Sequence, residues 1–216
     1  MPNTLARAAA VLALPAAIAF AAPAPVRAEP CADVELVFAR GTAEPPGMGR
    51  VGDALYTSLR STLGDQSVSA YAVDYPASYN FLTTGRGADD ARGRIAWMAA
   101  QCPSTRIVLG GFSQGASAVS MLAGVPPVGD RIGSIGSAPA LDPALTSNIA
   151  AVAVFGNPSA RFGSSLATTG QFAGRAIDVC SGGDPICSDG RDRSAHSNYE
   201  LPPYPERAAR FIAARI

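Results

Sequence analysis

The chain has 216 residues, of which 48% are hydrophobic and 16% charged, and its 17 basic side chains balance 17 acidic ones. This balance argues against nucleic acid or an anionic membrane as a partner, because both bind proteins that carry an excess of positive charge. The sequence holds one histidine and no Cys-x-x-Cys pair, so we expect neither a metal site nor a cofactor.

The first 28 residues have the pattern of a secretory signal peptide. Arg7 precedes an apolar run over residues 8–22, and Val26-Arg27-Ala28 is a small-residue site of the kind that signal peptidase cuts. We therefore predict a soluble mature protein, residues 29–216, that is secreted or associated with the cell wall and carries a net charge of about −2. No later apolar run reaches the roughly 20 residues that a membrane-spanning helix needs.

Residues 29–216 have the length of a single domain, and their hydrophobic periodicity alternates between strand and helix. The predicted strands cover 34–38, 68–73, 105–109, 149–155 and 176–180. The predicted helices cover 49–63, 88–101, 116–122 and 206–216. The predicted loops are 40–47, 74–84, 159–173 and 124–145, the last with at most a short helix. This order predicts an α/β fold with a central parallel sheet covered by helices on both faces.

A glycine-rich turn joins the third predicted strand to the third predicted helix. Gly111-Phe112-Ser113-Gln114-Gly115 fits the Gly-x-Ser-x-Gly pattern of a nucleophile elbow, in which the serine hydroxyl projects from the sheet edge. An ordinary glycine-rich turn also matches this pattern, but the flanking strand and helix favour the elbow. Ser113 is therefore the candidate nucleophile.

A serine hydroxyl needs a neighbouring base to attack a carbonyl, and His196 is the single histidine of the chain. The polar neighbours of His196 are typical of a surface loop. Because α/β-hydrolases place their triad in the order serine, acid, histidine, its position after Ser113 nevertheless favours the role of base. The acid of the triad is then expected between Ser113 and His196. Asp184 is the best candidate, and Asp189 and Asp192 are less favoured alternatives. The alternative for Asp184 is an ordinary Asp-Pro turn.

Two groups of donors are predicted to stabilise the negative charge that develops on the substrate oxygen. The N–H of Gln114 is one donor, because this residue follows the nucleophile in the elbow. The loop after the first strand should supply the second, where Thr42 offers both an N–H and a hydroxyl, although threonine is also an ordinary turn residue. Loss of one such donor costs about 2.7–4 kcal/mol of transition-state stabilisation.

Four cysteines in an exported chain are predicted to form two disulfides, and three pairings are possible. Cys180 and Cys187 bracket the turn that holds Asp184 and could close a short loop around it. That pairing would leave Cys31, beside the first strand, for Cys102 at the end of a helix.

Four segments stand in a distinctive order. They are Ala39-Arg40-Gly41-Thr42-Ala43-Glu44, Gly111-Phe112-Ser113-Gln114-Gly115, Cys180-Ser181-Gly182-Gly183-Asp184-Pro185-Ile186-Cys187, and Ala195-His196 followed by Tyr199. In this order they resemble the cutinase family of secreted serine esterases, in particular its actinobacterial and mycobacterial members. The resemblance spans the mature chain. It implies a small α/β-hydrolase with a five-stranded parallel sheet, no large lid and a serine open to solvent.

The resemblance also carries residue roles. It implies a triad of Ser113, Asp184 and His196, and it supports Thr42 as an oxyanion residue. It further supports the disulfide pairs Cys31 with Cys102 and Cys180 with Cys187.

Two positions depart from the usual pattern of that family. Phe112 stands where tyrosine is common, a change that should be tolerated because this side chain is expected to point away from the reacting group. Thr42 stands where fungal relatives usually carry serine, and its methyl group could narrow the site. Residues 124–148 match no motif, so the resemblance says least about the substrate pocket.

The residues predict a carboxylic ester hydrolase that forms an acyl-enzyme with short- to medium-chain fatty acyl or lipid esters, including polymeric ones. Tyr75, Tyr79, Phe81 and the segment near Leu201 could form an apolar acyl groove, or they could be ordinary packing residues. Two alternative functions are an acyltransferase that uses the same acyl-enzyme and a catalytically silent secreted binding or antigen protein. We expect a monomer, because no heptad pattern or apolar face indicates a partner.

Overall fold

Five parallel strands form one sheet in residues 31–125 and 135–216, the part of the chain that the computed structural model describes. They are β1 (Val34–Ala39), β2 (Val68–Ala72), β3 (Arg106–Phe112), β4 (Ile149–Phe155) and β5 (Ala176–Val179). Their order across the sheet is β2-β1-β3-β4-β5, and each neighbouring pair is parallel. The predicted fold class is therefore confirmed. The predicted signal peptide lies outside the described residues.

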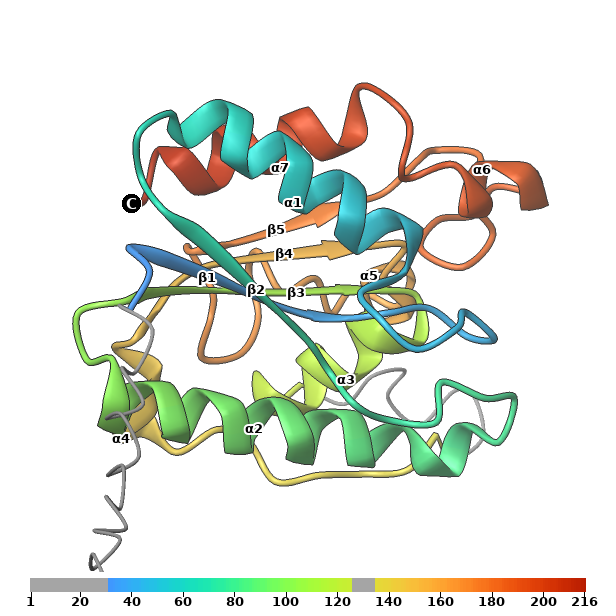
Figure 1. Cartoon of the computed structure of the whole chain (residues 1–216). Coiled ribbons are helices and arrows are strands. Elements are labelled where there is room, and N and C mark those ends of the chain that lie inside the picture. Colours follow the sequence, from blue (N-terminus) through green and yellow to red (C-terminus); the bar gives the residue numbers. More distant parts are fainter. Residues whose placement is uncertain (1–30, 126–134) are drawn as a thin grey trace, which may run out of the picture. The chain divides into compact units, whose positions relative to one another are not determined.

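Helices cover both faces of the sheet (Figure 1). One face carries α1 (Gly49–Leu63) and α7 (Tyr204–Ala213), and the other carries α2 (Thr84–Gln101), α3 (Gln114–Leu122) and the short α4 (Pro143–Thr146). The remaining short elements are the 3-10 turn η1 (Phe81–Thr83), α5 (Pro158–Arg161) and α6 (Arg193–Ser197). This layering matches the arrangement that the alternation of strands and helices predicts.

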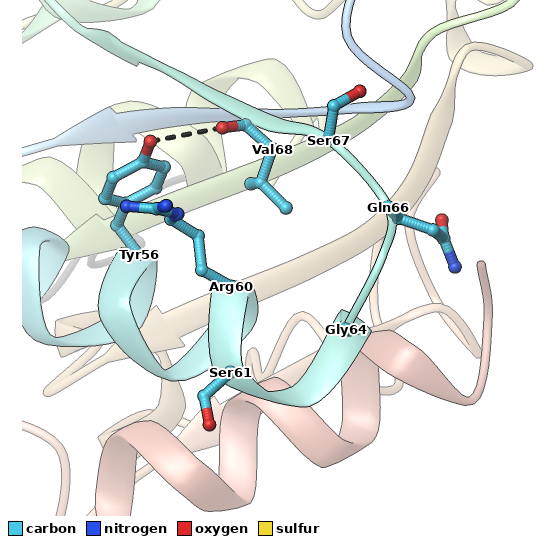
Figure 2. A pocket seen from close by; sticks show the side chains of 7 residues that line it. All are labelled: Tyr56, Arg60, Ser61, Gly64, Gln66, Ser67 and Val68. Atoms are coloured by element: carbon cyan, nitrogen blue, oxygen red, sulfur yellow. Dashed lines mark hydrogen bonds between the residues drawn. The ribbon is translucent and has the colours of Figure 1, made fainter.

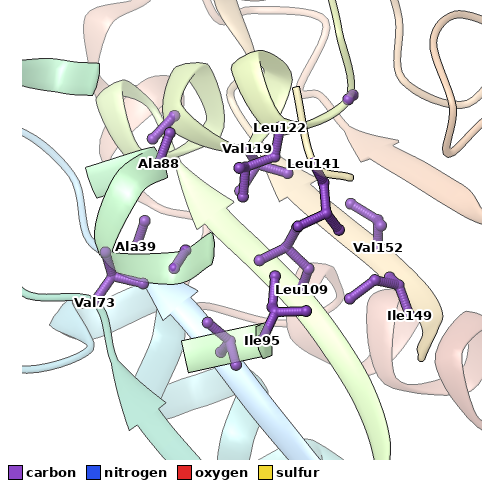
Figure 3. Packing of buried hydrophobic residues seen from close by; sticks show 14 of the residues in the cluster. Ala39, Val73, Ala88, Ile95, Leu109, Val119, Leu122, Leu141, Ile149 and Val152 are labelled. Atoms are coloured by element: carbon purple, nitrogen blue, oxygen red, sulfur yellow. The ribbon is translucent and has the colours of Figure 1, made fainter. Parts of the chain in front are cut away.

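Burial along the elements follows from this layering. Every residue of β1 is buried because helices cover both sides of the central strands, whereas β2 at the sheet edge is only partly buried. In α1, Val51, Leu55 and Leu59 recur every four residues and are buried toward the sheet. Figure 3 shows the apolar cluster on the opposite face, which includes Ala39, Val73, Ala88, Ile95, Leu109, Val119, Leu122, Leu141, Ile149 and Val152.

The structure differs from the sequence prediction mainly at short helices. α2 begins at Thr84 rather than at residue 88, and α5 begins next to the predicted loop 159–173 and extends into it. α6, which contains His196, lies in residues 191–199, a segment whose sequence predicts a loop. A capping side chain starts each of the latter two helices, since Asn157 and Asp192 accept hydrogen bonds from backbone N–H groups two residues later. Such one-turn helices show no hydrophobic periodicity by which a sequence could predict them.

The carboxyl ends of the strands bring together segments that are distant in sequence. β1 leads to the loop with Thr42, β3 leads to Ser113, and β5 leads to the loop with Asp184. Ligands of open α/β sheets bind at this edge. The described helices include none that is long and apolar enough to cross a membrane.

Candidate active site

Ser113 occupies a sharp turn between β3 and α3. Its backbone has φ 54° and ψ −112°, a conformation with positive φ that serine adopts only where the surrounding structure imposes it. The turn requires glycine on both sides. A Cβ on Gly115 would collide with the carbonyl of Ala39, and a Cβ on Gly111 would lie 2.5 Å from the carbonyl carbon of Gly115. The turn therefore has the geometry of a nucleophile elbow.

Three of the predicted site residues form one chain of hydrogen bonds. His196 Nε2 lies 2.9 Å from Ser113 Oγ, and His196 Nδ1 lies 2.8 Å from Asp184 Oδ2. The elbow, the helix α6 and the loop after β5 each contribute one of these side chains. The arrangement is that of a nucleophile, a base and an acid that orients the base.

Asp184 is the carboxylate that reaches the imidazole, and the two other candidates have different partners. The side chain of Asp189 is 99% exposed and lies 3.6 Å from the guanidinium of Arg161. Asp192 accepts a hydrogen bond of 2.9 Å from the N–H of Ser194 and thereby caps α6. Asp192 thus supports the helix that carries the histidine rather than contacting the imidazole.

Both carboxylate oxygens of Asp184 are hydrogen bonded in a fully buried position. Oδ1 accepts from the N–H of Ile186 at 2.7 Å, and Oδ2 accepts from the hydroxyl of Tyr199 at 2.7 Å as well as from His196. Burial raises the pKa of Asp184, but the hydrogen bonds from His196, Tyr199 and the N–H of Ile186 together with the nearby imidazole hold its pKa below the usual value. The carboxylate therefore stays ionised at neutral pH.

Tyr199 is a site residue whose role the sequence analysis does not identify. Its side chain is fully buried, and its hydroxyl accepts from the N–H of Ser181 at 2.9 Å while it donates to Asp184. Burial, together with the carboxylate of Asp184, raises the pKa of the Tyr199 hydroxyl, so this group stays protonated as a donor. The signal in the sequence is a tyrosine three residues after the histidine.

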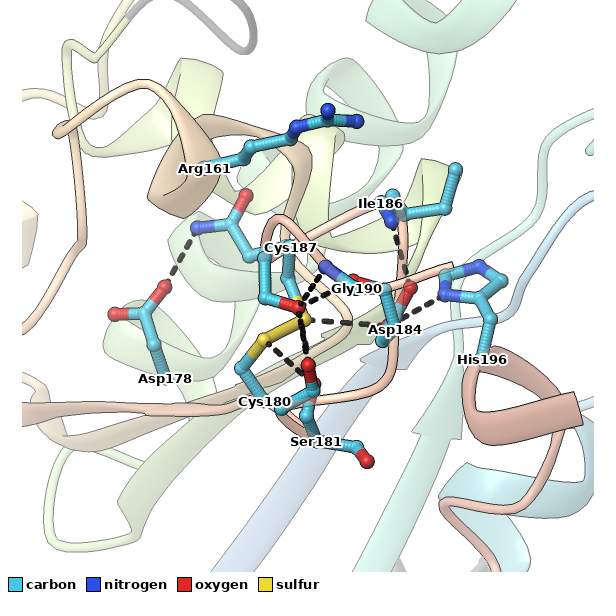
Figure 4. The surroundings of a disulfide bond; sticks show 12 residues. Arg161, Asp178, Cys180, Ser181, Asp184, Ile186, Cys187, Gly190 and His196 are labelled. Atoms are coloured by element: carbon cyan, nitrogen blue, oxygen red, sulfur yellow. Dashed lines mark hydrogen bonds and ion pairs between the residues drawn. A yellow bond between two sulfur atoms is a disulfide. The ribbon is translucent and has the colours of Figure 1, made fainter. Parts of the chain in front are cut away.

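Both disulfides implied by the resemblance are present. Cys31 is bonded to Cys102 with an S–S distance of 2.01 Å, and Cys180 is bonded to Cys187 with an S–S distance of 1.97 Å. Figure 4 shows the second bond beside Asp184 and close to His196. Because this bond closes a loop of only a few residues, it restricts the position of the carboxylate.

Thr42 and Gln114, the predicted oxyanion residues, lie beside Ser113 in the wall of one cavity. The Thr42 hydroxyl donates to Gln114 Oε1 at 3.1 Å, and Gln114 Nε2 donates to the Thr84 hydroxyl at 3.0 Å. The Thr84 hydroxyl in turn donates to the carbonyl of Phe81 at 2.7 Å, which fixes the orientation of the Gln114 amide. The Thr42 hydroxyl hydrogen is therefore directed at Gln114, and the backbone N–H is the remaining donor of Thr42.

Comparison with known proteins places this geometry in a family. A family model for Cutinase matches residues 30–216. Phospholipase Culp4 of Mycobacterium tuberculosis is 47% identical over 194 residues, which cover 89% of this chain and 83% of Culp4. The chain belongs to the cutinase family.

Other relatives agree with this assignment. Carboxylesterase Culp1 of Mycobacterium bovis is 38% identical over 226 residues, an alignment that covers 100% of this chain and 97% of Culp1. A Trichoderma reesei cutinase in complex with a C11Y4 phosphonate inhibitor has a TM-score of 0.64 at 30% identity, covering 86% of this chain and 77% of that chain. The catalytic core domain of a Trichoderma reesei acetyl xylan esterase shares the fold, with a TM-score of 0.73 at 22% identity over 87% of this chain and 100% of that chain. The protein is a cutinase-like carboxylesterase, which confirms the predicted enzyme class.

Ser113 of this cutinase-family protein faces a cavity of about 220 Å³. The cavity is lined by Thr42, Phe81, Ser113, Gln114, Ser117, Ile135, Pro158, Arg161, Phe162, Pro185 and Ile186. Among the four aromatic and apolar positions suggested for an acyl groove, Phe81 alone lines this cavity. Tyr75 is buried and donates its hydroxyl to the carbonyl of Arg40, while Tyr79 and Leu201 are exposed outside the cavity lining.

Phe112 packs against the histidine. The expectation that its side chain points away from the reacting group holds only in part, because its ring centroid lies 5.1 Å from that of His196 and 5.9 Å from that of Tyr199. Phe112 is also almost fully buried. An apolar ring at this position therefore supports one side of the imidazole without competing for its hydrogen bonds.

Gly156, which follows β4, makes room for the imidazole. Its φ is +55°, and a Cβ at this position would lie 2.8 Å from His196 Cε1 and 3.2 Å from Asp184 Oδ2. We expect Gly156→Ala to lower kcat about 100-fold, because displacement of a catalytic group by about 1 Å has an effect of that size. Steady-state kinetics on a nitrophenyl ester measures this loss of kcat.

Gly64→Ala is the matched control for that substitution. Gly64 has a similar φ of +62°, but a Cβ at this position would have no atom within 4 Å, so its replacement adds backbone strain alone. We expect Gly64→Ala to lower the melting temperature and leave kcat within about twofold of the unmodified enzyme. Equal losses of kcat in the two variants would contradict the role of Gly156.

A second hollow, of about 580 Å³, lies where α1 ends and β2 begins (Figure 2). It is lined by Tyr56, Arg60, Ser61, Gly64, Gln66, Ser67 and Val68. These lining residues include no histidine and no carboxylate, and the hollow lies at the amino end of β2, away from the strand ends that carry the triad candidates.

Within the described residues, no group of three or more histidine, cysteine, aspartate or glutamate side chains could hold a metal ion.

Proposed function

We propose that the protein is a secreted esterase that hydrolyses short- to medium-chain fatty acyl or lipid esters through an acyl-enzyme on Ser113. The observation that carries this proposal is the continuous chain of hydrogen bonds from Ser113 through His196 to Asp184 at the wall of a mainly apolar cavity. Two disulfides support secretion, because such bonds persist in oxidising compartments. The protein acts as a monomer in this proposal.

In the first half of the reaction, Ser113 Oγ attacks the ester carbonyl carbon and its proton moves to His196 Nε2. The oxyanion that forms accepts hydrogen bonds from the backbone N–H groups of Thr42 and Gln114. His196 then returns the proton to the alcohol oxygen as the ester bond breaks. The alcohol leaves, and the acyl group stays on Ser113.

In the second half, water attacks the acyl-enzyme. His196 accepts a proton from this water and passes it to Ser113 Oγ when the carboxylic acid leaves. Asp184 holds the Nδ1 proton throughout, so that Nε2 can accept, and its charge stabilises the imidazolium that forms in each half. The enzyme returns to its starting state.

The size of the cavity supports a limited acyl chain. Its volume of about 220 Å³ lies below the roughly 300–1,000 Å³ that holds a whole drug-sized ligand, so the cavity accommodates only part of a substrate. Its aromatic and aliphatic lining fits a hydrocarbon chain. The names of the relatives, which include a phospholipase and a cutinase, support lipid esters as the substrate class.

A graded series of nitrophenyl esters, from acetate to palmitate, tests this proposal. We expect the highest kcat/KM with short and medium chains, and a steep fall once the chain exceeds the cavity. Addition of a labelled alcohol separates hydrolysis from acyl transfer, because a transferase would place most acyl groups on the alcohol. Absence of turnover with every ester would contradict the proposal and favour a silent binding protein.

A further inference from the structure

Arg161 is the one charged side chain among the described residues that line the active-site cavity. It ends α5, and its side chain is about 39% exposed, so that the guanidinium borders both the apolar wall and the solvent. The guanidinium group of arginine is a planar cation with five N–H donors and no acceptor. An apolar cavity with one fixed cation at its border suits a ligand that has both a hydrocarbon part and an anion.

The position of Arg161 is fixed by the anchoring of α5 on the sheet. Asn157, the cap of this helix, is buried and accepts a hydrogen bond from the N–H of Ser159 at 3.1 Å. Its Nδ2 donates to Asp178 Oδ1 on β5 at 2.7 Å. The guanidinium thus projects from a helix that is hydrogen bonded to β5, the strand that leads to the loop with Asp184.

The protein partners of the guanidinium leave donors for a ligand. Nη1 donates to the carbonyl of Pro185 at 2.5 Å, and Nε lies 3.6 Å from Asp189 Oδ1. A guanidinium carries five N–H donors in a planar fork. The Asp189 side chain is 99% exposed, and an ion pair with so exposed a partner contributes little. Asp189 is therefore a counterion that an anionic ligand can replace. Figure 4 shows Arg161 at the side of the disulfide-closed loop that carries Asp184.

We propose that Arg161 makes this cavity selective for acyl esters whose alcohol part carries a phosphate group. The hydrocarbon chain contacts the apolar wall while the guanidinium donates two parallel hydrogen bonds to phosphate oxygens, a geometry that arginine forms better than lysine. The proposal rests on the esterase activity proposed above, and it adds the charge of the leaving alcohol as a determinant of specificity.

Two soluble esters with the same acyl chains test this selectivity. They are 1,2-dihexanoylglycerol, which is neutral, and dihexanoylphosphatidylglycerol, which carries an anionic phosphodiester, both used below the concentration at which they aggregate. The measured quantity is the ratio of kcat/KM for the phosphate ester to kcat/KM for the neutral ester. We expect Arg161→Gln to lower this ratio about tenfold, which corresponds to about 1.4 kcal/mol.

Two further variants give matched comparisons. Arg161→Lys keeps the positive charge but loses the planar pair of donors of the guanidinium, so the ratio should fall by less than in Arg161→Gln. Asp189→Asn removes the competing counterion, so the ratio should rise. An increase in salt should lower the ratio of the unmodified enzyme and leave that of Arg161→Gln unchanged, because exposed charge interactions are screened.

The outcomes separate this proposal from the esterase proposal. A ratio that is the same in Arg161→Gln and in the unmodified enzyme would overturn the proposed selectivity. Arg161 would then have only a structural role, as the donor of a hydrogen bond from α5 to the carbonyl of Pro185. A ratio that falls in Asp189→Asn would also overturn it. Failure of the unmodified enzyme to cleave either ester would instead overturn the esterase proposal on which this inference rests.

Discussion

Alanine at His196 is expected to abolish ester hydrolysis. His196 Nε2 lies 2.9 Å from Ser113 Oγ, and the chain contains no other histidine that could take its place. Without the imidazole the serine proton has no acceptor in the attack, and the alcohol has no donor when it leaves. We expect kcat to fall by about 10⁶, the loss that removal of the equivalent histidine causes in subtilisin. Hydrolysis of a short-chain nitrophenyl ester measures this loss.

Arg193→Ala is the matched control for that substitution. Arg193 is an exposed residue of the same short helix α6 and lies outside the cavity lining. Its replacement should leave kcat within about twofold, since surface substitutions of this kind have small effects. If His196→Ala retained measurable hydrolysis above the level of Ser113→Ala, the base of this enzyme would not be the histidine.

Asp184→Asn is expected to lower kcat by about 10⁴, the loss that the corresponding change causes in a serine protease. The hydrogen bonds of this site explain the size of the effect. Because the N–H of Ile186 faces Oδ1 at 2.7 Å, an asparagine would keep its oxygen there and turn its NH₂ group toward His196 Nδ1. The imidazole would then carry its proton on Nε2, the atom that must accept the proton of Ser113.

Asp192→Asn provides the comparison for the acid. Asp192 caps α6 by accepting from the N–H of Ser194, and asparagine caps a helix about as well as aspartate does. This variant should therefore keep near-normal kcat. A loss of several orders of magnitude in Asp192→Asn, with little loss in Asp184→Asn, would show that the acid has been assigned to the wrong residue.

The sequence predicts the parts of this protein that depend on local patterns. The five strands carry apolar runs, and the elbow has a short signature in which glycine is sterically required, as the contacts of Gly111 and Gly115 show. The single histidine leaves no choice of imidazole. His196 lies within hydrogen-bonding distance of both Ser113 and Asp184, and the catalytic roles of these three residues stay a prediction.

The parts that the sequence does not predict depend on contacts between distant segments. Nothing in the order of residues shows that Gly156 makes room for His196, or that the Tyr199 hydroxyl donates to Asp184, because these residues meet only when the loops after β4 and β5 fold together. The suggested acyl groove fails at Tyr75 for the same reason. The Tyr75 hydroxyl donates a hydrogen bond to the carbonyl of Arg40, so this side chain is buried and does not line the cavity.

Labelling with a fluorophosphonate tests the central claim most directly, because this reagent forms a covalent adduct with an activated serine. The purified protein is treated with the reagent and digested, and the modified peptide is identified by mass spectrometry. We expect one adduct, on Ser113, and none in Ser113→Ala. Absence of an adduct on Ser113, or equal labelling of the Ser113→Ala variant, would contradict the assignment of Ser113 as the nucleophile.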